Sequence, residues 1–300
     1  MIRRVLLAVL ATALVSPAWA EPLRVGSKRF TESYILAEIL AQSAQRASVS
    51  AEHRPGLGNT AIVFEALRSG AIDAYPEYTG TIAKEILKAD DARDLEAINR
   101  RLAPLGLAAS VPFGFSNGYA LGMLEPTAKA RGIATLSDLA RHPELSLGLS
   151  HEFLRRDDGW PGLRAAYGVK QGDPRGLDHG IAYEALAAGQ VEVIDLYTTD
   201  AKISRLGLRV LADDRRFFPR YDAVVLHRAD VAKRHPQAFA AWTALQGRID
   251  EATMIRLNGR AELDRIAFPA VAGEFLGAKA NAAPRGLWSA VFAPDFARLA

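Results

Sequence analysis

The chain has 300 residues and no cysteine, and its 37 basic and 34 acidic residues give a formal net charge of +3. The lack of cysteine excludes disulfides, thiolate metal ligands and a thiol nucleophile. The nearly balanced charge, without basic runs, argues against nucleic-acid binding. A chain of this length can bury a sizeable core and tends to divide into two lobes.

The first twenty residues have the pattern of a secretory signal peptide. Arg3 and Arg4 precede an apolar run from Val5 to Val15, and Ala18-Trp19-Ala20 is a small-x-small cleavage pattern. The apolar run is too short to span a membrane. We therefore expect cleavage after Ala20 and a periplasmic protein of 300 − 20 = 280 residues. Without a cysteine to lipidate, this protein is expected to have no membrane anchor.

Strands and helices are predicted to alternate in the N-terminal part. Leu23 to Gly26 is typical of a buried strand, and a helix follows with apolar residues at helical spacing and Thr31 as its N-cap. Residues 49–54 predict a second strand, and a turn at residues 56–60 precedes a second helix. This rhythm indicates an α/β fold with mainly parallel sheets flanked by helices.

The middle of the chain continues the pattern. Ser137 is expected to cap a short helix ending near Arg141, and a strand is predicted at residues 145–149. Pro161 opens another helix, and residues after Ala229 are mostly helical. No Pro/Ser-rich linker interrupts the sequence. Two lobes without such a linker predict that the chain crosses between them through the structure itself.

An internal repeat supports the division into two lobes. Residues 64–79 recur as residues 183–198, with six of sixteen aligned positions identical. Each copy is predicted to contain a helix end, a glycine stop, a strand, and a loop that opens with Tyr-Thr. Tyr78 and Tyr197 would then occupy equivalent places on two lobes. Ligands of open parallel sheets bind outside the carboxyl ends of the strands, where both tyrosines and Lys28 are expected.

Catalytic motifs are incomplete. The segment Gly148-Leu149-Ser150-His151-Glu152 has Glu where a nucleophile elbow has its second glycine. His151 is not followed by a second histidine at the spacing of a zinc-protease helix. We therefore expect no catalytic site, metal or cofactor. An exported hydrolase that uses Ser150 or His151 remains an alternative.

Seven short motifs follow one another along the chain: Val25–Glu32, Gly58-Asn59-Thr60, Tyr75–Thr81, Gly114–Ala120, Glu152–Arg156, Tyr197–Asp200 and Phe217–Ala223. These motifs, in this order, resemble one family, the glycine betaine/choline-binding proteins of osmoprotectant ABC importers. The resemblance runs from about residue 23 to 228 and continues more loosely beyond. It implies a type II periplasmic-binding-protein fold, with two α/β lobes, a ligand cleft between them and two chain crossings. Lobe 1 is expected at 21–118 plus 220–300, and lobe 2 at 119–219.

The resemblance implies an aromatic cage. A quaternary ammonium has no N–H to donate, so ring faces must hold it through cation–π contacts. The family's cage positions fall on Tyr78, Tyr119, Tyr197 and Tyr221. The other tyrosines are predicted to be packing residues, with Tyr75 in a strand and three in helices: Tyr34, Tyr167 and Tyr183.

For a ligand carboxylate the resemblance points to Lys28, Thr81 and Arg156, which offer an ammonium, a hydroxyl and a guanidinium. The choice of Arg156 over Arg155 rests only on the family alignment. A neutral hydroxyl at Thr81 favours glycine betaine over choline, because an acidic residue there would suit a ligand without a carboxylate. Asn117 is assigned to the rim of the trimethylammonium group.

The predicted function is that of a monomeric, non-catalytic periplasmic receptor. It would bind a quaternary-ammonium osmoprotectant without a cofactor and deliver it to an ABC permease at the inner membrane. Besides the hydrolase, a binding protein for another small solute, such as an amino acid, a polyamine or proline betaine, remains open.

Overall fold

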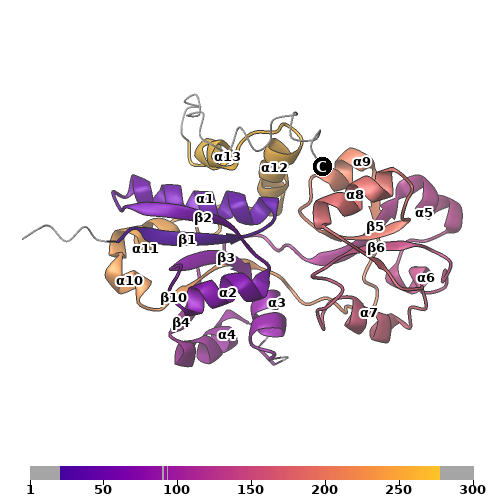
Figure 1. Cartoon of the computed structure of the whole chain (residues 1–300), viewed down its shortest axis with the longest axis horizontal. Coiled ribbons are helices and arrows are strands. Elements are labelled where there is room, and N and C mark those ends of the chain that lie inside the picture. Colours follow the sequence, from indigo (N-terminus) through magenta and orange to yellow (C-terminus); the bar gives the residue numbers. More distant parts are fainter. Residues whose placement is uncertain (1–20, 90, 93, 278–300) are drawn as a thin grey trace, which may run out of the picture.

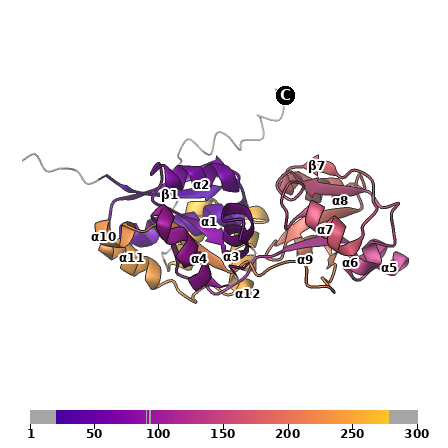
Figure 2. The same cartoon turned by 90° about the horizontal axis from the view of Figure 1, so that it is seen from below.

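The computed structural model describes residues 21–89, 91–92 and 94–277. The predicted signal peptide, its cleavage after Ala20 and the end of lobe 1 at 278–300 lie outside the described residues. Figures 1 and 2 show two lobes side by side, one formed by both ends of the described chain and one by its middle. Among the described residues, no helix combines the length and apolar character needed to cross a bilayer.

Lobe 1 consists of a five-stranded sheet in the order β2-β1-β3-β10-β4 and the helices packed on it. β1 runs parallel to β2 and β3, whereas β10 runs antiparallel to β3 and β4. The strands are β1 (Leu23–Lys28), β2 (Ala51–Gly58), β3 (Ala74–Tyr78), β4 (Leu107–Ser110) and β10 (Ala223–Arg228).

Helices cover both faces of this sheet (Figure 1). On one face, α1 packs against α11, α12 and α13, and the buried Trp242 indole donates a hydrogen bond to the Leu40 carbonyl at 2.9 Å. The C-terminal helices therefore complete the lobe that the N-terminal strands begin. The helices of lobe 1 are α1 (Thr31–Arg46), α2 (Thr60–Arg68), α3 (Thr79–Thr81), a π-helix (Ile82–Ile86), α4 (Leu95–Leu102), a 3₁₀ turn (Ala103–Leu105), α10 (Val231–Arg234), α11 (Pro236–Thr243), α12 (Glu251–Glu262) and α13 (Phe268–Phe275).

Lobe 2 consists of a second sheet in the order β7-β6-β8-β5-β9 and its own helices. β6 runs parallel to β7 and β8, and β5 runs antiparallel to β8 and β9. Its elements are β5 (Tyr119–Leu124), α5 (Glu125–Arg131), α6 (Leu136–Leu139), β6 (Leu147–Ser150), α7 (Trp160–Tyr167), β7 (Arg175–Leu177), α8 (His179–Ala187), β8 (Val193–Tyr197), α9 (Lys202–Leu206) and β9 (Leu208–Val210).

The predicted two-lobed α/β fold is confirmed, and each sheet contains one reversed strand. In each sheet four of the five strands run in one direction, and the fifth, β10 or β5, runs against its neighbours. These two strands follow the segments in which the chain crosses from one lobe to the other, between β4 and β5 and between β9 and β10. A strand that enters from the other lobe is free of the direction that a βαβ crossover imposes.

The internal repeat has the predicted structure in both lobes. In each copy a helix, α2 or α8, ends before a glycine with positive φ, 78° at Gly70 and 69° at Gly189. The following strand, β3 or β8, ends at Tyr78 or Tyr197. β3 and β8 hold the same third place in their sheets. The repeat therefore places the two tyrosines at equivalent strand ends.

Helix starts were predicted less well. The N-cap of α1 is Phe30 rather than Thr31, and the N-cap of α6 is Thr135 rather than Ser137. Thr135 forms a capping box, in which its hydroxyl accepts from the Asp138 amide at 3.0 Å. Asn59 caps α2, as the turn before that helix suggested.

The two crossing segments lie side by side. Ser116 and Asp222 form an antiparallel bridge, and the Asn117 amide donates to the Tyr221 carbonyl at 3.0 Å. The connection between the lobes is therefore a short two-stranded ribbon, and two of the predicted site residues belong to it.

Candidate ligand-binding cleft

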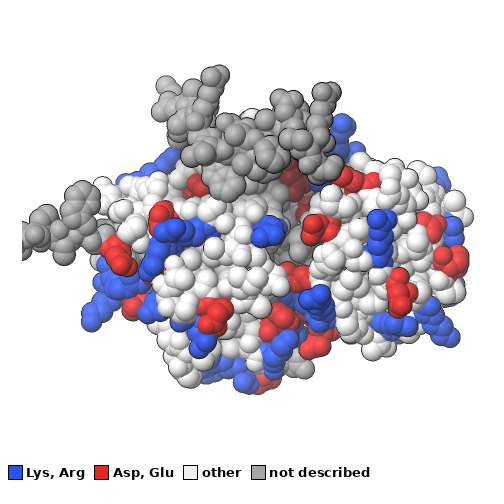
Figure 3. Space-filling model, in the orientation of Figure 1, with Lys and Arg blue, Asp and Glu red and all other residues white. Residues whose placement is uncertain are grey.

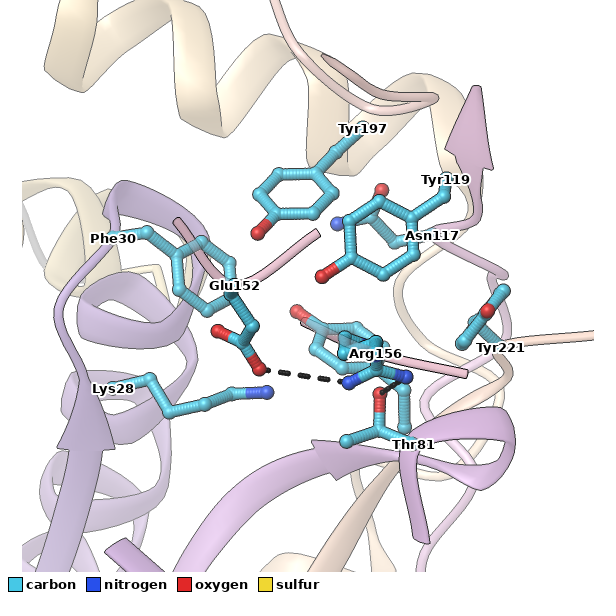
Figure 4. A pocket seen from close by; sticks show the side chains of 10 residues that line it. Lys28, Phe30, Thr81, Asn117, Tyr119, Glu152, Arg156, Tyr197 and Tyr221 are labelled. Carbon is cyan, nitrogen blue, oxygen red and sulfur yellow. Dashed lines mark hydrogen bonds and ion pairs between the residues drawn. The ribbon is translucent and has the colours of Figure 1, made fainter. Parts of the chain in front are cut away.

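A cleft lies between the lobes, and Figure 3 shows the hollow that separates them. All eight residues predicted from the sequence line it, together with Phe30 and Glu152, which the prediction missed (Figure 4). Lobe 1, lobe 2 and the ribbon between them all contribute. The predicted residues are Lys28, Tyr78, Thr81, Asn117, Tyr119, Arg156, Tyr197 and Tyr221.

Five aromatic rings form the apolar part of the lining. Phe30 lies between the two repeat tyrosines, with ring centroids 6.4 Å from Tyr78 and 5.4 Å from Tyr197. Tyr119 lies 5.2 Å from Tyr197 and meets Tyr221 edge to face at 5.8 Å. These spacings are typical of paired aromatic rings, so the rings support one another around the cleft.

Hydrogen bonds fix the orientation of two of these tyrosines. The Tyr78 hydroxyl donates to Glu32 at 2.6 Å, and the Tyr221 hydroxyl donates to Asp158 at 2.7 Å. A third ring, that of Tyr197, stacks on His179 at 4.3 Å. These contacts of the hydroxyl groups and of the Tyr197 ring face hold the three rings in place before a ligand binds.

The four other tyrosines lie away from the cleft, in the elements predicted for them. Tyr75 is fully buried in β3, and Tyr34 stacks on Phe268 at 4.8 Å. Tyr183 donates its hydroxyl to Asp200 at 2.7 Å, and Tyr167 donates to Asp213.

The cleft contains two basic side chains, and each already has a protein partner. Lys28 is buried and its ammonium lies 2.6 Å from a Glu77 carboxylate oxygen. The same ammonium lies 5.1 Å from the Tyr78 ring centroid and 5.5 Å from that of Phe30. Burial raises the pKa of Glu77, and the Lys28 charge offsets part of that rise.

Arg156 is buried and forms a bidentate pair with Asp158, through Nε at 2.8 Å and Nη2 at 2.6 Å. Its Nη2 also lies 3.4 Å from the Thr81 hydroxyl of lobe 1. Arg155 is exposed, so the arginine that lines the cleft is Arg156, as the alignment had suggested. The third nitrogen, Nη1, lies 3.5 Å from Glu152.

A buried carboxylate, Glu32, lies behind the aromatic rings of the cleft. Glu32, at the start of α1, accepts hydrogen bonds from Tyr78 and Asn117 through one oxygen, at 2.6 and 2.9 Å. Its other oxygen accepts from Thr199 of lobe 2 at 2.6 Å and from Asn258 of α12 at 3.0 Å. Burial raises the pKa of Glu32, and these four hydrogen bonds offset part of the rise.

The hydroxyl of Ser150, the alternative nucleophile, is engaged in hydrogen bonds that hold the local backbone. Its hydroxyl donates to the buried Asp195 at 2.7 Å and accepts from the Phe153 amide at 3.2 Å. His151 is exposed. The serine therefore caps the loop after β6.

Residues 21–278 match the family of substrate-binding domains of ABC-type glycine betaine transport systems. The chain belongs to this family. Membership confirms the resemblance seen in the motifs, and the family is one of transport binding proteins rather than a class of enzymes.

Two relatives and one solved structure that are similar to the chain have names that state different ligands. A glycine-betaine-binding protein of Pseudomonas aeruginosa is 36% identical, over 92% of this chain and 94% of the relative. An ergothioneine transport permease/ergothioneine binding protein of Helicobacter pylori is 33% identical, over 85% of this chain but 47% of the relative. The crystal structure of a glycine betaine/carnitine/choline ABC transporter protein superposes with a TM-score of 0.70, at 29% identity, over 85% of this chain and 97% of the other.

Gly80 lies next to the Tyr221 ring, and its substitution tests how tightly that ring is packed. A Cβ at Gly80 would lie 2.5 Å from the Tyr221 ring and 2.7 Å from the Arg220 carbonyl oxygen, so Gly80→Ala must displace the ring or α3. We expect a loss of stability of about 1–3 kcal/mol and at least ~10-fold weaker binding of a ligand in the cleft. Gly118→Ala is the matched control, because its Cβ would meet the same ring at an ordinary 3.6 Å. Calorimetric titration should show a loss in the first variant only; equal affinities for both would contradict the packing argument.

Proposed function

We propose that this protein is the solute-binding component of an ABC importer, that it captures a quaternary-ammonium osmoprotectant in the cleft between its lobes, and that glycine betaine is its preferred ligand. The observation that carries the proposal is the convergence of four tyrosines and Phe30, from both lobes and the connecting ribbon, on one cleft. Aromatic faces are what a trimethylammonium group requires, because it offers no hydrogen-bond donor.

The contacts available in the cleft are sufficient for micromolar affinity. Each ring face contributes roughly 0.5–2 kcal/mol to binding of a cation, and each charge-assisted hydrogen bond to a carboxylate roughly 1.5–3 kcal/mol. Part of this is spent on ordering the closed state. A remainder of about 8 kcal/mol corresponds to micromolar affinity.

Glycine betaine is favoured because Thr81 and Arg156 offer uncharged and cationic donors on the same side of the cleft. Tyr78, Lys28 and Thr81 come from lobe 1, and Arg156 and Tyr197 from lobe 2. A ligand that contacts both groups stabilises the closed arrangement of the lobes, so binding and closure are coupled.

Export and delivery complete the proposal. The signal-peptide pattern of residues 1–20 supports a periplasmic location with cleavage after Ala20. Delivery of the ligand to an inner-membrane permease follows from the role of such domains in ABC importers. We propose that the protein does this as a monomer and without catalysis.

Calorimetric titration with matched ligands tests the function. Glycine betaine should bind, whereas tert-butylacetate, which has the same shape without the positive charge, should bind on the order of 100-fold more weakly. Glycine, which lacks the methyl groups, should not compete. Choline, carnitine, ergothioneine, proline betaine, a polyamine and standard amino acids complete the panel. The proposal that the rings bind a quaternary ammonium would be overturned by equal affinity for glycine betaine and tert-butylacetate. It would also be overturned if an amino acid were the only ligand that binds.

A further inference from the structure

Glu152 places a carboxylate inside the cleft. Its side chain is 26% exposed, and one of its oxygens accepts a 2.6 Å hydrogen bond from the Thr60 hydroxyl. The same oxygen lies 3.5 Å from Nη1 of Arg156. Thr60 begins α2 in lobe 1, whereas Glu152 and Arg156 belong to lobe 2, so this oxygen links the two lobes.

The position of this carboxylate coincides with the subsite expected for an anion. The Asp158 carboxylate already takes two of the three guanidinium nitrogens of Arg156, Nε and Nη2. The remaining nitrogen, Nη1, faces Glu152, and Figure 4 shows the Glu152 side chain directed into the space between Lys28 and Arg156. A ligand carboxylate bound to Arg156 would have to use the nitrogen that Glu152 now approaches.

The charges around the cleft add to the competition between Glu152 and a ligand carboxylate for Arg156. Lys28 and Arg156 supply two positive charges, and their partners Glu77 and Asp158 balance them. Glu152 then adds an unbalanced carboxylate next to the rings. The charge of Glu152 also acts on a ring of the cleft. The pKa of the Tyr197 hydroxyl is raised, mainly by burial and next by the negative charge of Glu152. An incoming carboxylate meets like-charge repulsion at this point, whereas a ligand with only a positive charge does not.

We propose that Glu152 acts as an internal competitor for the carboxylate of a zwitterionic ligand, and so sets the selectivity between betaines and purely cationic quaternary amines. The inference rests on the proposed function and adds a specificity-determining residue to it. When glycine betaine binds, its carboxylate displaces Glu152 from Arg156. When choline binds, Glu152 stays in place and its charge favours the trimethylammonium group in the cage.

The variant Glu152→Gln tests this, because the amide oxygen can still accept from Thr60 while the charge is lost. We expect glycine betaine to bind about tenfold more tightly to Glu152→Gln than to the wild type, and choline several-fold more weakly. Calorimetric titration of both proteins with both ligands gives the ratio of the two dissociation constants. The expected change in this ratio is about 30-fold in favour of glycine betaine.

Two further variants separate the role of Glu152 from general effects of charge and folding. Glu65→Gln removes the same charge from an exposed position on α2, where Glu65 pairs with Arg68, and should leave the ratio unchanged. Thr60→Val removes the hydroxyl that holds Glu152 and should shift the ratio in the same direction as Glu152→Gln, by a smaller factor.

The outcomes are distinct. If Glu152→Gln weakens glycine betaine, or changes both ligands by the same factor, the competitor role is overturned while the binding function stands. If the wild type binds neither ligand, the proposed function itself is overturned, and this inference falls with it.

Discussion

Replacing Tyr197 with alanine should weaken glycine betaine binding on the order of 100-fold, through the loss of one cation–π face and of the ring that closes the lobe 2 side of the cage. The ring is half-buried and rests against Phe30, Tyr119 and His179, at centroid distances of 5.4, 5.2 and 4.3 Å. Its removal therefore opens the cleft wall and also loosens its three neighbouring rings. Calorimetric titration measures the loss.

Two control variants give this result a specific meaning. Tyr197→Phe keeps the ring and should keep most of the affinity, since the ammonium is held by the face rather than by the hydroxyl. Tyr34→Ala removes a comparably exposed ring that stacks on Phe268 outside the cleft, and should bind as the wild type does. Tyr197→Ala should also reduce the preference for glycine betaine over tert-butylacetate, because one of the five rings that line the cleft is lost. If Tyr197→Ala and Tyr34→Ala behave alike, the cage does not include Tyr197.

The second large effect is expected at Glu32, and it concerns stability. Glu32→Ala leaves four buried donors, on Tyr78, Asn117, Thr199 and Asn258, without their acceptor. An unpaired buried donor costs about 1–3 kcal/mol, and rearrangement or water entry relieves part of the sum. We expect the free energy of unfolding to fall by about 3–5 kcal/mol in urea denaturation. Glu65→Ala, at an exposed site, should change it by less than ~0.5 kcal/mol.

The pH dependence of stability provides a separate check on Glu32. Burial raises the pKa of Glu32 above its ordinary value of 4.5, so the folded state binds the proton more tightly than the unfolded state does. The stability that this proton contributes is complete below pH 4.5 and is lost as the pH rises through the folded-state pKa. The stability advantage of wild type over Glu32→Gln should therefore shrink as pH rises from 4.5. An advantage that grows with pH in urea denaturation series would contradict a raised pKa.

The repeat and the motifs predicted the fold and the composition of the cleft well, because both depend on local pattern. A helix, a left-handed glycine and a strand ending in tyrosine are readable within sixteen residues, and both copies formed as expected at Tyr78 and Tyr197. The direction of β5 and β10 was missed because it depends on chain crossings, which leave no local trace.

Other parts of the site were hidden for a different reason. The four partners of Glu32 are 46, 85, 167 and 226 residues away from it in the chain, so nothing near Glu32 signals a buried network. Glu152 did have a local signal, since it stands four residues before Arg156 on the same turn of chain. Phe30 lies within a motif already recognised, next to Lys28 and Thr31. Only the folded arrangement shows that both side chains face the cleft.

The strand order of lobe 1 has a consequence for how the chain is built. β10 lies between β3 and β4, although it follows the whole of lobe 2 in sequence. The sheet of lobe 2 has all its strands once residue 210 is available, whereas β4 has no partner until residues 223–228 arrive. For a polypeptide that emerges N-terminus first, we expect the middle of the chain to fold before the ends do. Truncation after β9 should therefore leave lobe 2 able to fold while β4 remains without its partner strand.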